Sequence, residues 1–257
     1  MALHPCLFLD ISIFFESSKK GAILLSLGTN VKSSTIGPER IQIFIKTMRK
    51  FPDYHFLWKF EEDPSSLNLP KNVMVKKWIE QNNILAHPKV ILFLTHGGLL
   101  SSQEATWHGV PMLGIPVVGD QHSNVKRSID AGVAESVNIY SLNEDELTSK
   151  LKKMLEDTSY RHKMSQRSSR FRDRPLHPLK EALWWCEYML RHKGAPHLRS
   201  QARALRDPTL FMWDLLIVWM VGFVGVIFGF NYLVKRVFKT KEIEQYWLPK
   251  VERIKYN

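Results

Sequence analysis

The side chains best suited to chemistry in this chain lie between residues 78 and 124, around the turn Thr95-His96-Gly97-Gly98. Glycines just before a helix let backbone N–H groups approach an anion, and the helix N-terminus adds partial positive charge. The His96 imidazole can donate a hydrogen bond to a phosphate oxygen, and Ser101 adds a hydroxyl in the first turn of the expected helix. This pattern favours a phosphate site, although glycine-rich turns after strands are also common where no ligand binds.

The same stretch contains an indole, an amide and a carboxylate that suit the rest of a nucleotide. Trp78 can stack on a planar base, and Gln81, three residues later, can hydrogen-bond a base edge. Glu104, farther along the helix, can accept hydrogen bonds from both hydroxyls of a ribose. Taken singly, a core tryptophan and a solvated helix glutamate are the commoner interpretations, so the prediction rests on their combination.

Asp120 and Gln121 begin a later helix. Aspartate is a good N-cap residue, so capping explains Asp120 as well as binding to sugar hydroxyls does. The sequence leaves these two interpretations open.

These side chains can meet only if the segments that carry them form one sheet. Short apolar segments alternate with helical ones, which is typical of a parallel sheet covered on both faces. Ligands bind such sheets beyond the carboxyl ends of the strands, so we expect the loops at Gly28, Trp78, His96 and Asp120 to converge. The expected strands cover residues 22–27, 55–59, 73–76, 90–94 and 112–115, and the expected helices cover residues 38–50, 99–107 and 120–132.

After residue 141 the pattern becomes mostly helical. Ser141-Leu142-Asn143-Glu144 resembles a capping box for a helix over residues 142–156, and two more helices are expected through Arg191. The sequence therefore predicts one α/β domain with a helical tail, followed by a linker over residues 193–212.

The apolar run LLIVWMVGFVGVIFGFNYLV, residues 215–234, has about the ~20 residues needed to cross a hydrocarbon core. A buried core helix is the alternative, but core helices of this length without a charge are rare. We predict a transmembrane helix over residues 213–234. Basic residues at positions 235, 236, 239 and 241 follow, so the positive-inside rule places the basic tail, 235–257, in the cytosol and residues 1–212 in the lumen.

Composition argues against several other classes. The chain has 257 residues, of which 44% are hydrophobic, enough for one sizeable core. The net charge of +11 comes from lysines and arginines spread along the chain, so we expect no nucleic-acid partner. Cys6 and Cys186 are too few for a disulfide framework or a four-cysteine zinc site. There is no G-x-S-x-G elbow and no H-x-x-x-H pair, so we expect neither a hydrolase triad nor a metal.

The motifs together resemble the donor-binding signature of UDP-glycosyltransferases, most closely that of the membrane-anchored animal UDP-glucuronosyltransferase group. The resemblance extends from about Phe14 to the tail: SLGTN at 26–30 is similar to the family's first loop, and RHKGAPHLRS at 191–200 to its pre-membrane segment. The motifs that carry it are Trp78-x-x-Gln81, Leu85-x-His87-Pro88, Thr95-His96-Gly97-Gly98, Ser101, Glu104, Gly109-Val110-Pro111, Pro116, Asp120-Gln121 and Asn124.

This resemblance implies an α/β fold, the Rossmann-like C-terminal half of a GT-B glycosyltransferase, followed by one transmembrane helix. The donor-binding domain with its helical tail would cover residues 14–192, after an atypical N-terminus over residues 1–13. The resemblance also implies a single-pass protein of the endoplasmic reticulum membrane. UDP-sugar would be a co-substrate, and no cofactor is implied.

The resemblance assigns roles to individual residues. Trp78 would stack on uracil, Gln81 would contact the base or ribose, and Glu104 would bind the ribose hydroxyls. Asp120 and Gln121 would contact hydroxyls of the transferred sugar. The diphosphate would be held by Thr29, His96, Gly98 and Ser101, with Asn124 as a weaker candidate.

Two features depart from the family pattern. Glu80 stands where proline is usual, and we expect its charge and freer backbone to weaken donor binding. The family's histidine base and its orienting aspartate belong to an N-terminal domain that would precede residue 14. His4 is too isolated to be that base, and the first residues, interrupted by Pro5 and Asp10, do not resemble a signal peptide. We therefore expect no catalytic residue in this chain.

The sequence predicts a UDP-glycosyltransferase that transfers glucuronate or glucose from UDP to a hydroxyl of a small lipophilic acceptor, with inversion. Two alternatives stay open. In the first, the chain is a donor-binding or regulatory module that forms homo- or hetero-oligomers with full-length relatives. In the second, the chain is part of a longer gene product. Both alternatives predict little sugar transfer by this chain alone.

Overall fold

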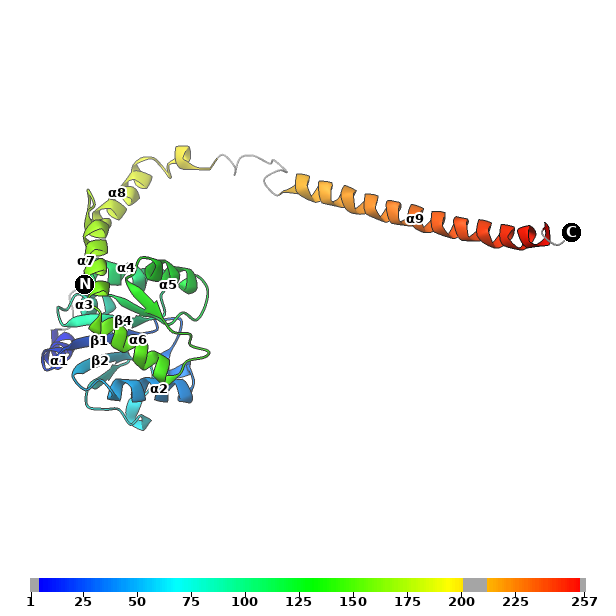
Figure 1. Cartoon of the computed structure of the whole chain (residues 1–257). Coiled ribbons are helices and arrows are strands. Elements are labelled where there is room, and N and C mark those ends of the chain that lie inside the picture. The colour runs from blue at the N-terminus through cyan, green and yellow to red at the C-terminus, as the bar shows by residue number, and fades with distance from the viewer. Residues whose placement is uncertain (1–4, 201–211, 255–257) are drawn as a thin grey trace. The chain divides into compact units, whose positions relative to one another are not determined.

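The computed structural model describes residues 5–200 and 212–254 (Figure 1). The chain forms two compact units, Met1–Pro175 and Leu176–Asn257. The first unit contains the sheet and the second contains the two C-terminal helices α8 (Pro178–Arg191) and α9 (Trp213–Ile254).

The first unit is built on one six-stranded sheet with the strand order β3-β2-β1-β4-β5-β6. All neighbouring strands are parallel, which confirms the predicted parallel sheet. The order reverses between β1 and β4, and doubly wound sheets bind their ligands at this switch point. The strands are β1 (Gly21–Ser26), β2 (Tyr54–Lys59), β3 (Val73–Lys76), β4 (Val90–Thr95), β5 (Met112–Gly114) and β6 (Ala134–Ser136).

Strand β6 was not predicted from the sequence. It has three residues, with Glu135 in the middle, and therefore shows neither an apolar run nor an alternating pattern. Its pairing with β5, rather than its own composition, makes it a strand.

Helices cover both faces of the sheet, which explains why β1 is buried along its whole length. Ile23 and Leu25 belong to one core cluster, which receives the apolar faces of α2 (Pro38–Arg49) and α6 (Glu144–Glu156). Ala22 and Leu24 belong to the other, with side chains from helices on the opposite face. Those helices are α1 (Pro5–Glu16), α3 (Gln81–Leu85), α4 (Leu99–His108) and α7 (Ser159–Arg172).

Helix α1 contributes to this core, although the sequence analysis separated residues 1–13 from the domain. Ile11 and Phe15 are buried in the second cluster. The His55 Nδ1 atom lies 2.6 Å from the Phe14 carbonyl oxygen, and the two rings stack with their centroids 4.4 Å apart. Pro5 does not interrupt this segment: it is the first residue of the helix, where a missing N–H costs nothing.

Helix α6 begins later than predicted. The N-cap is Asn143, whose side chain accepts a hydrogen bond from the backbone N–H of Glu146 at 2.8 Å. The capping box proposed on Ser141 is therefore wrong. Asn143 rather than Ser141 is the N-cap because it directly precedes the first turn, Glu144-Asp145-Glu146. The acidic side chains of this turn interact favourably with the positive end of the helix dipole.

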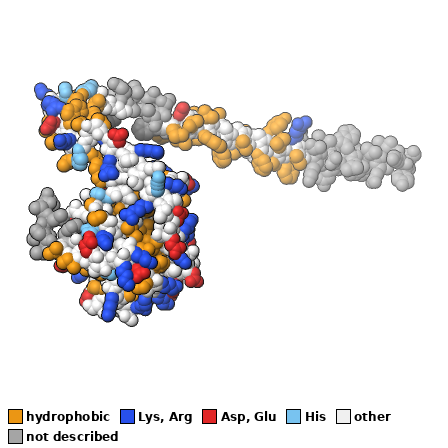
Figure 2. All heavy atoms as spheres, turned by 60° about the vertical axis from the view of Figure 1, so that its left-hand side comes forward, with side chains coloured by type: hydrophobic (Ala, Val, Ile, Leu, Met, Phe, Trp, Pro, Cys, Tyr) orange, Lys and Arg blue, Asp and Glu red, His pale blue; other side chains and the backbone are white. Residues whose placement is uncertain are grey.

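In the second unit, the stretch from Trp213 to Phe238 is long and apolar enough to cross a membrane. The stretch has 26 residues, its most apolar 18-residue window has a mean hydropathy of 2.1, and none of that window is buried. Figure 2 shows hydrophobic side chains along this part of α9, with basic side chains toward its end. The helix continues to Ile254, beyond the predicted limit at residue 234. Most of the predicted linker, residues 201–211, and the last tail residues lie outside the described part of the chain.

Candidate functional site

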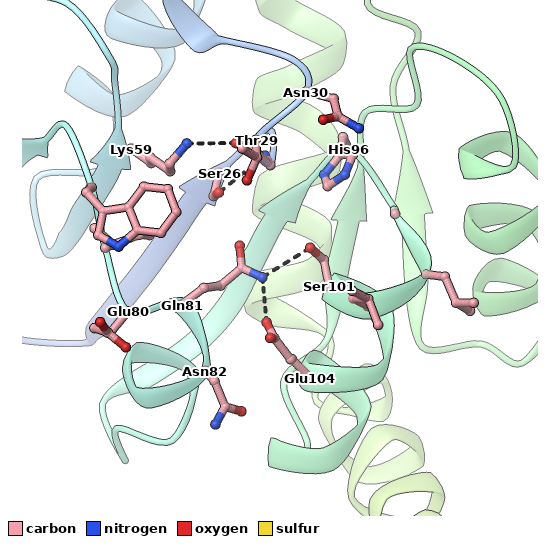
Figure 3. A pocket seen from close by; sticks show the side chains of 16 residues that line it. Ser26, Thr29, Asn30, Lys59, Glu80, Gln81, Asn82, His96, Ser101 and Glu104 are labelled. Atoms are coloured by element: carbon pink, nitrogen blue, oxygen red, sulfur yellow. Dashed lines mark hydrogen bonds between the residues drawn. The ribbon is translucent and has the colours of Figure 1, made fainter. Parts of the chain in front are cut away.

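A cleft of about 510 Å³ opens at the switch point of the sheet. Its walls come from the loop after β1, the end of β2, the segment that follows β3, and the β4–α4 turn (Figure 3). The loops at Gly28, Trp78 and His96 therefore converge as expected, whereas the Asp120 loop, which was expected to join them, does not line the cleft. Seven of the predicted site residues line this cleft: Thr29, Trp78, Gln81, His96, Gly98, Ser101 and Glu104.

A polar bridge crosses the cleft between α3 and α4. Gln81, the first residue of α3, donates from Nε2 to Oε2 of Glu104 at 2.6 Å and to Oγ of Ser101 at 3.1 Å. Ser101 and Glu104 lie one turn apart on α4, so their oxygens point to the same side (Figure 3). Glu104 is therefore not the solvated helix glutamate that was the alternative interpretation.

Trp78 lies two residues beyond the end of β3, with 60% of its surface exposed. The core tryptophan of the sheet is Trp58, which is fully buried. The indole of Trp78 is thus free to receive a planar group. On one side, the Lys59 Nζ atom lies 5.5 Å from the ring centroid, within the range of a cation–π contact.

Lys59 lines the cleft but was not among the predicted site residues. It is the last residue of β2 and only 6% exposed. Its Nζ donates to the Gly28 carbonyl oxygen at 2.7 Å and to Oε1 of Glu61 at 3.1 Å. The signal in the sequence was a lysine at the carboxyl end of an otherwise apolar strand, where side chains reach the switch point.

The imidazole of His96 packs between two glycines. A Cβ atom added at Gly28 would lie 2.6 Å from Cε1 of His96, and one at Gly98 would lie 2.5 Å from Nε2. These glycines therefore make room for the ring, besides exposing backbone N–H groups. Gly28 also has φ of +88°, which favours glycine.

Burial of His96 favours its neutral form. Desolvation lowers the pKa of His96, the nearby Asp120 carboxylate opposes this effect, and the Lys59 ammonium adds to it. Its Nδ1 atom is buried and has no hydrogen-bond partner among the described residues. A neutral imidazole has one N–H to donate, and here no other described group competes for Nδ1.

The three remaining predicted residues start helix α5 (Gln121–Asp130) and do not line the cleft. The Asn124 Nδ2 atom donates to Oδ2 of Asp120 at 2.7 Å and to the Gly97 carbonyl at 3.2 Å. Gln121 is buried, and its Oε1 accepts from the backbone N–H groups of residues 117 and 118 at 2.8 and 3.0 Å. Asp120 is exposed and is the N-cap residue of α5, but its side chain makes no capping bond and instead accepts a hydrogen bond from Asn124.

The comparison with protein families fits this geometry. The family model described as "UDP-glucoronosyl and UDP-glucosyl transferase" matches residues 4–242, nearly the whole chain. This chain belongs to the UDP-glycosyltransferase family. The family predicted from the motifs of residues 78–124 is thereby confirmed.

Curated relatives of this UDP-glycosyltransferase chain include enzymes from insects and vertebrates. UDP-glucosyltransferase 2 of Dactylopius coccus is 34% identical over 250 residues, which are 97% of this chain and 47% of that protein. UDP-glucuronosyltransferase 2B7 of Homo sapiens is 36% identical over 219 residues, which are 84% of this chain and 40% of that protein. The chain thus spans less than half the length of these relatives.

Solved structures share the fold. The crystal structure of Medicago truncatula UGT71G1 complexed with UDP-glucose is 21% identical, with a TM-score of 0.59 over 68% of this chain and 41% of that one. At 21% identity, the similarity shows the fold alone. It confirms the predicted Rossmann-like, GT-B type of sheet.

Proposed function

We propose that the cleft is the UDP-sugar donor site of a glycosyltransferase. Trp78 stacks on uracil, Gln81 contacts the base or ribose, and Glu104 accepts the ribose hydroxyls. The observation that carries this proposal is the bridge from Gln81 to Ser101 and Glu104, which sets amide, hydroxyl and carboxylate beside the exposed indole. A uridine needs a stacking surface and polar partners in this arrangement.

The diphosphate lies toward the β4–α4 turn in this proposal. The α4 N-terminus presents backbone N–H groups and partial positive charge there, and neutral His96 donates one further hydrogen bond. The buried Asn124 ties Asp120 to the turn through Gly97 and therefore contributes by positioning. The residues proposed to hold the diphosphate are Thr29, His96, Gly98 and Ser101.

The transferred sugar, glucuronate or glucose, extends toward α5, where the exposed Asp120 carboxylate accepts from its hydroxyls. Gln121 can contact the sugar only through its Nε2 group, because its Oε1 atom already accepts hydrogen bonds from the backbone N–H groups of residues 117 and 118. In the reaction, a hydroxyl of a small lipophilic acceptor attacks the anomeric carbon and its proton passes to a general base supplied from outside the cleft. The bond between the anomeric carbon and the diphosphate oxygen breaks, and UDP leaves, with inversion. The α4 N-terminus and His96 stabilise the charge that develops on the leaving diphosphate.

A second candidate is a donor-binding partner without turnover of its own. Two of the described cleft side chains that could act as a base are already engaged: Lys59 bonds Gly28 and Glu61, and Glu104 accepts from Gln81 through one oxygen. The family resemblance places the base of the reaction outside this cleft. In this case the chain would bind UDP-sugar in an oligomer with a full-length relative that supplies the base.

We further propose that residues 213–238 anchor the protein in the endoplasmic reticulum membrane as a single span. The support is the exposed apolar surface of this helix, followed by basic residues that include Lys235 and Arg236. The donor domain then lies in the lumen and the tail in the cytosol. In sealed microsomes, added protease should remove a C-terminal tag and leave the donor domain intact; the reverse pattern would refute this orientation.

The donor proposal is tested by calorimetric titration of UDP, UDP-glucose and UDP-glucuronate into the full chain in detergent micelles. Saturable binding that the Trp78→Ala variant loses supports the donor site, and the ranking of the two sugars identifies the preferred one. A folded chain that binds none of them refutes the site. Transfer to a phenol by the same sample would favour the enzyme, and binding without transfer would favour the partner.

A further inference from the structure

A second, smaller cleft of about 190 Å³ lies between helices α4, α5 and α7. Leu99, at the start of α4, lines both clefts. Beyond it the helix separates them, because Ser101 and Glu104 face the donor cleft while Ser102 and Thr106 line the other. Both clefts lie within the first unit, and nothing in the proposed transfer reaction uses the second.

Two guanidinium groups line this cleft, Arg127 from α5 and Arg167 from α7, and its described lining contains no carboxylate. Arg127 donates from Nη2 to Oδ1 of Asn124 at 3.0 Å and from Nε to the Ser123 carbonyl at 3.3 Å. Arg127 therefore keeps N–H groups that these contacts leave available.

Arg167 carries its charge without a counterion from the described part of the chain. It is half-buried, and burial lowers the pKa of its guanidinium with no acidic neighbour to oppose the effect. The surrounding helix adds positive charge, since α7 also contains Arg161, Lys163, Arg170 and Arg172. A partly buried, unpaired cation is unfavourable, so an anion bound here would be stabilised.

The cleft also contains an unsatisfied hydroxyl. Ser102 lines it, and its Oγ atom is buried with no hydrogen-bond partner among the described residues. The neighbouring Thr106 hydroxyl does not serve it, because Thr106 donates to the Ser102 carbonyl oxygen at 2.8 Å. Buried hydroxyls are normally paired, so Ser102 is a polar group beside the cleft whose hydrogen-bonding capacity the described residues leave unused.

We propose that this second cleft binds a phosphate-sized oxyanion, either free phosphate or a phosphomonoester group, between Arg127 and Arg167. The forked guanidinium donors suit phosphate oxygens, and about 190 Å³ admits a single phosphate group. This site is separate from the proposed donor function and does not depend on it. Because Arg127 bonds Asn124, and Asn124 bonds Asp120, an anion bound to Arg127 would lie three hydrogen bonds from the proposed sugar-binding carboxylate.

The test is phosphorus NMR on the full chain in a phosphorus-free detergent. Inorganic phosphate and glycerol 3-phosphate are titrated separately, so that the two sources of the phosphate group are distinguished. We expect saturable line broadening by at least one of them. The Arg167→Leu variant should bind about tenfold more weakly, as expected for a lost charge-assisted hydrogen bond.

Arg170→Leu is the matched control, since it removes the same charge from the exposed face of the same helix. Its affinity should stay within about twofold of the wild-type value. Equal losses in both variants, or broadening of the wild type that does not saturate, would overturn the proposal. Arg167→Gln replaces Arg167→Leu if circular dichroism shows the latter unfolded. Uridine, which carries no phosphate, is titrated into the same samples to test the donor cleft independently, so failure of either proposal is visible by itself.

Discussion

The Nε2 atom of Gln81 lies 2.6 Å from Oε2 of Glu104. This bond joins the start of α3 to the interior of α4 across the mouth of the cleft, and Ser101 shares the same donor. One carboxylate oxygen of Glu104 is thus held in place by the protein. The other is left for a ligand, which makes Glu104 a preorganised acceptor for ribose hydroxyls.

Glu104→Ala should lower the affinity for UDP by about tenfold or more, because hydrogen bonds to a charged acceptor contribute about 1.5–3 kcal/mol. Calorimetry of the full chain in micelles measures the loss. The control is 2′,3′-dideoxy-UDP, which lacks the ribose hydroxyls. Wild type and variant should bind it equally, and a further loss in the variant would show that Glu104 does not act on the ribose.

Trp78→Ala should weaken UDP binding by about tenfold or more, since stacking on a base contributes ~1–3 kcal/mol. Trp78→Phe should retain most of the affinity, because it keeps an aromatic face. Trp185→Ala removes an exposed indole from α8 and serves as the control. Comparable losses at residues 78 and 185 would contradict the stacking role.

Lys59→Met should lower the free energy of unfolding by about 1–3 kcal/mol, because the part-buried Gly28 carbonyl and Glu61 carboxylate lose their donor. Chemical denaturation followed by tryptophan fluorescence measures this change. Lys77→Met, at an exposed position just beyond β3, should leave stability unchanged. If both substitutions have the same effect, the contacts of Lys59 are not what stabilises this region.

His96 makes stability depend on pH. Its pKa is lowered by burial from the usual value of 6.5, so below pH 6.5 the unfolded chain binds a proton that the folded chain does not. The free energy of unfolding should therefore fall as the pH is lowered through 6.5 toward the folded-state pKa. His96→Gln should show a shallower slope.

The slope will not vanish in His96→Gln, because burial also lowers the pKa of His87 and His108. His122→Gln, at an exposed position on α5, is the control and should keep the wild-type slope. Denaturation curves between pH 5 and 8 measure both variants. Identical slopes for His96→Gln and wild type would exclude a contribution from His96.

Gly98→Ala should displace the His96 ring, since the new Cβ would lie 2.5 Å from Nε2. The backbone φ of Gly98, −58°, is acceptable for alanine, so steric overlap with the His96 ring is the main destabilising effect of the substitution. We expect UDP affinity to fall by about tenfold through the lost His96 and N–H contacts. Gly222→Ala, in helix α9, where the new Cβ would meet nothing within 4 Å, should bind UDP normally. A Gly98→Ala variant with wild-type affinity would show that His96 does not contribute to diphosphate binding.

Much of this molecule follows from short-range patterns. The apolar segments of β1 to β5 and the spacing of α2, α4 and α7 are local properties, and glycines at positions 28, 97 and 98 mark the turns between them. Parallel strands bring their carboxyl ends to one edge, so the convergence of the Gly28, Trp78 and His96 loops could be predicted as well.

Other features depend on contacts between segments far apart in the chain. Lys59 is a site residue only because β2 lies beside β1, which places its ammonium against the Gly28 carbonyl, and the short β6 exists only by pairing with β5. Two further features follow from how α5 and α7 pack around α4. Gln121 bonds the backbone N–H of Val117, and Arg127 and Arg167 line the same cleft. Residue types and spacing state which groups can bind a ligand, but burial and hydrogen-bond partners, set by long-range packing, decide which of them remain free to do so.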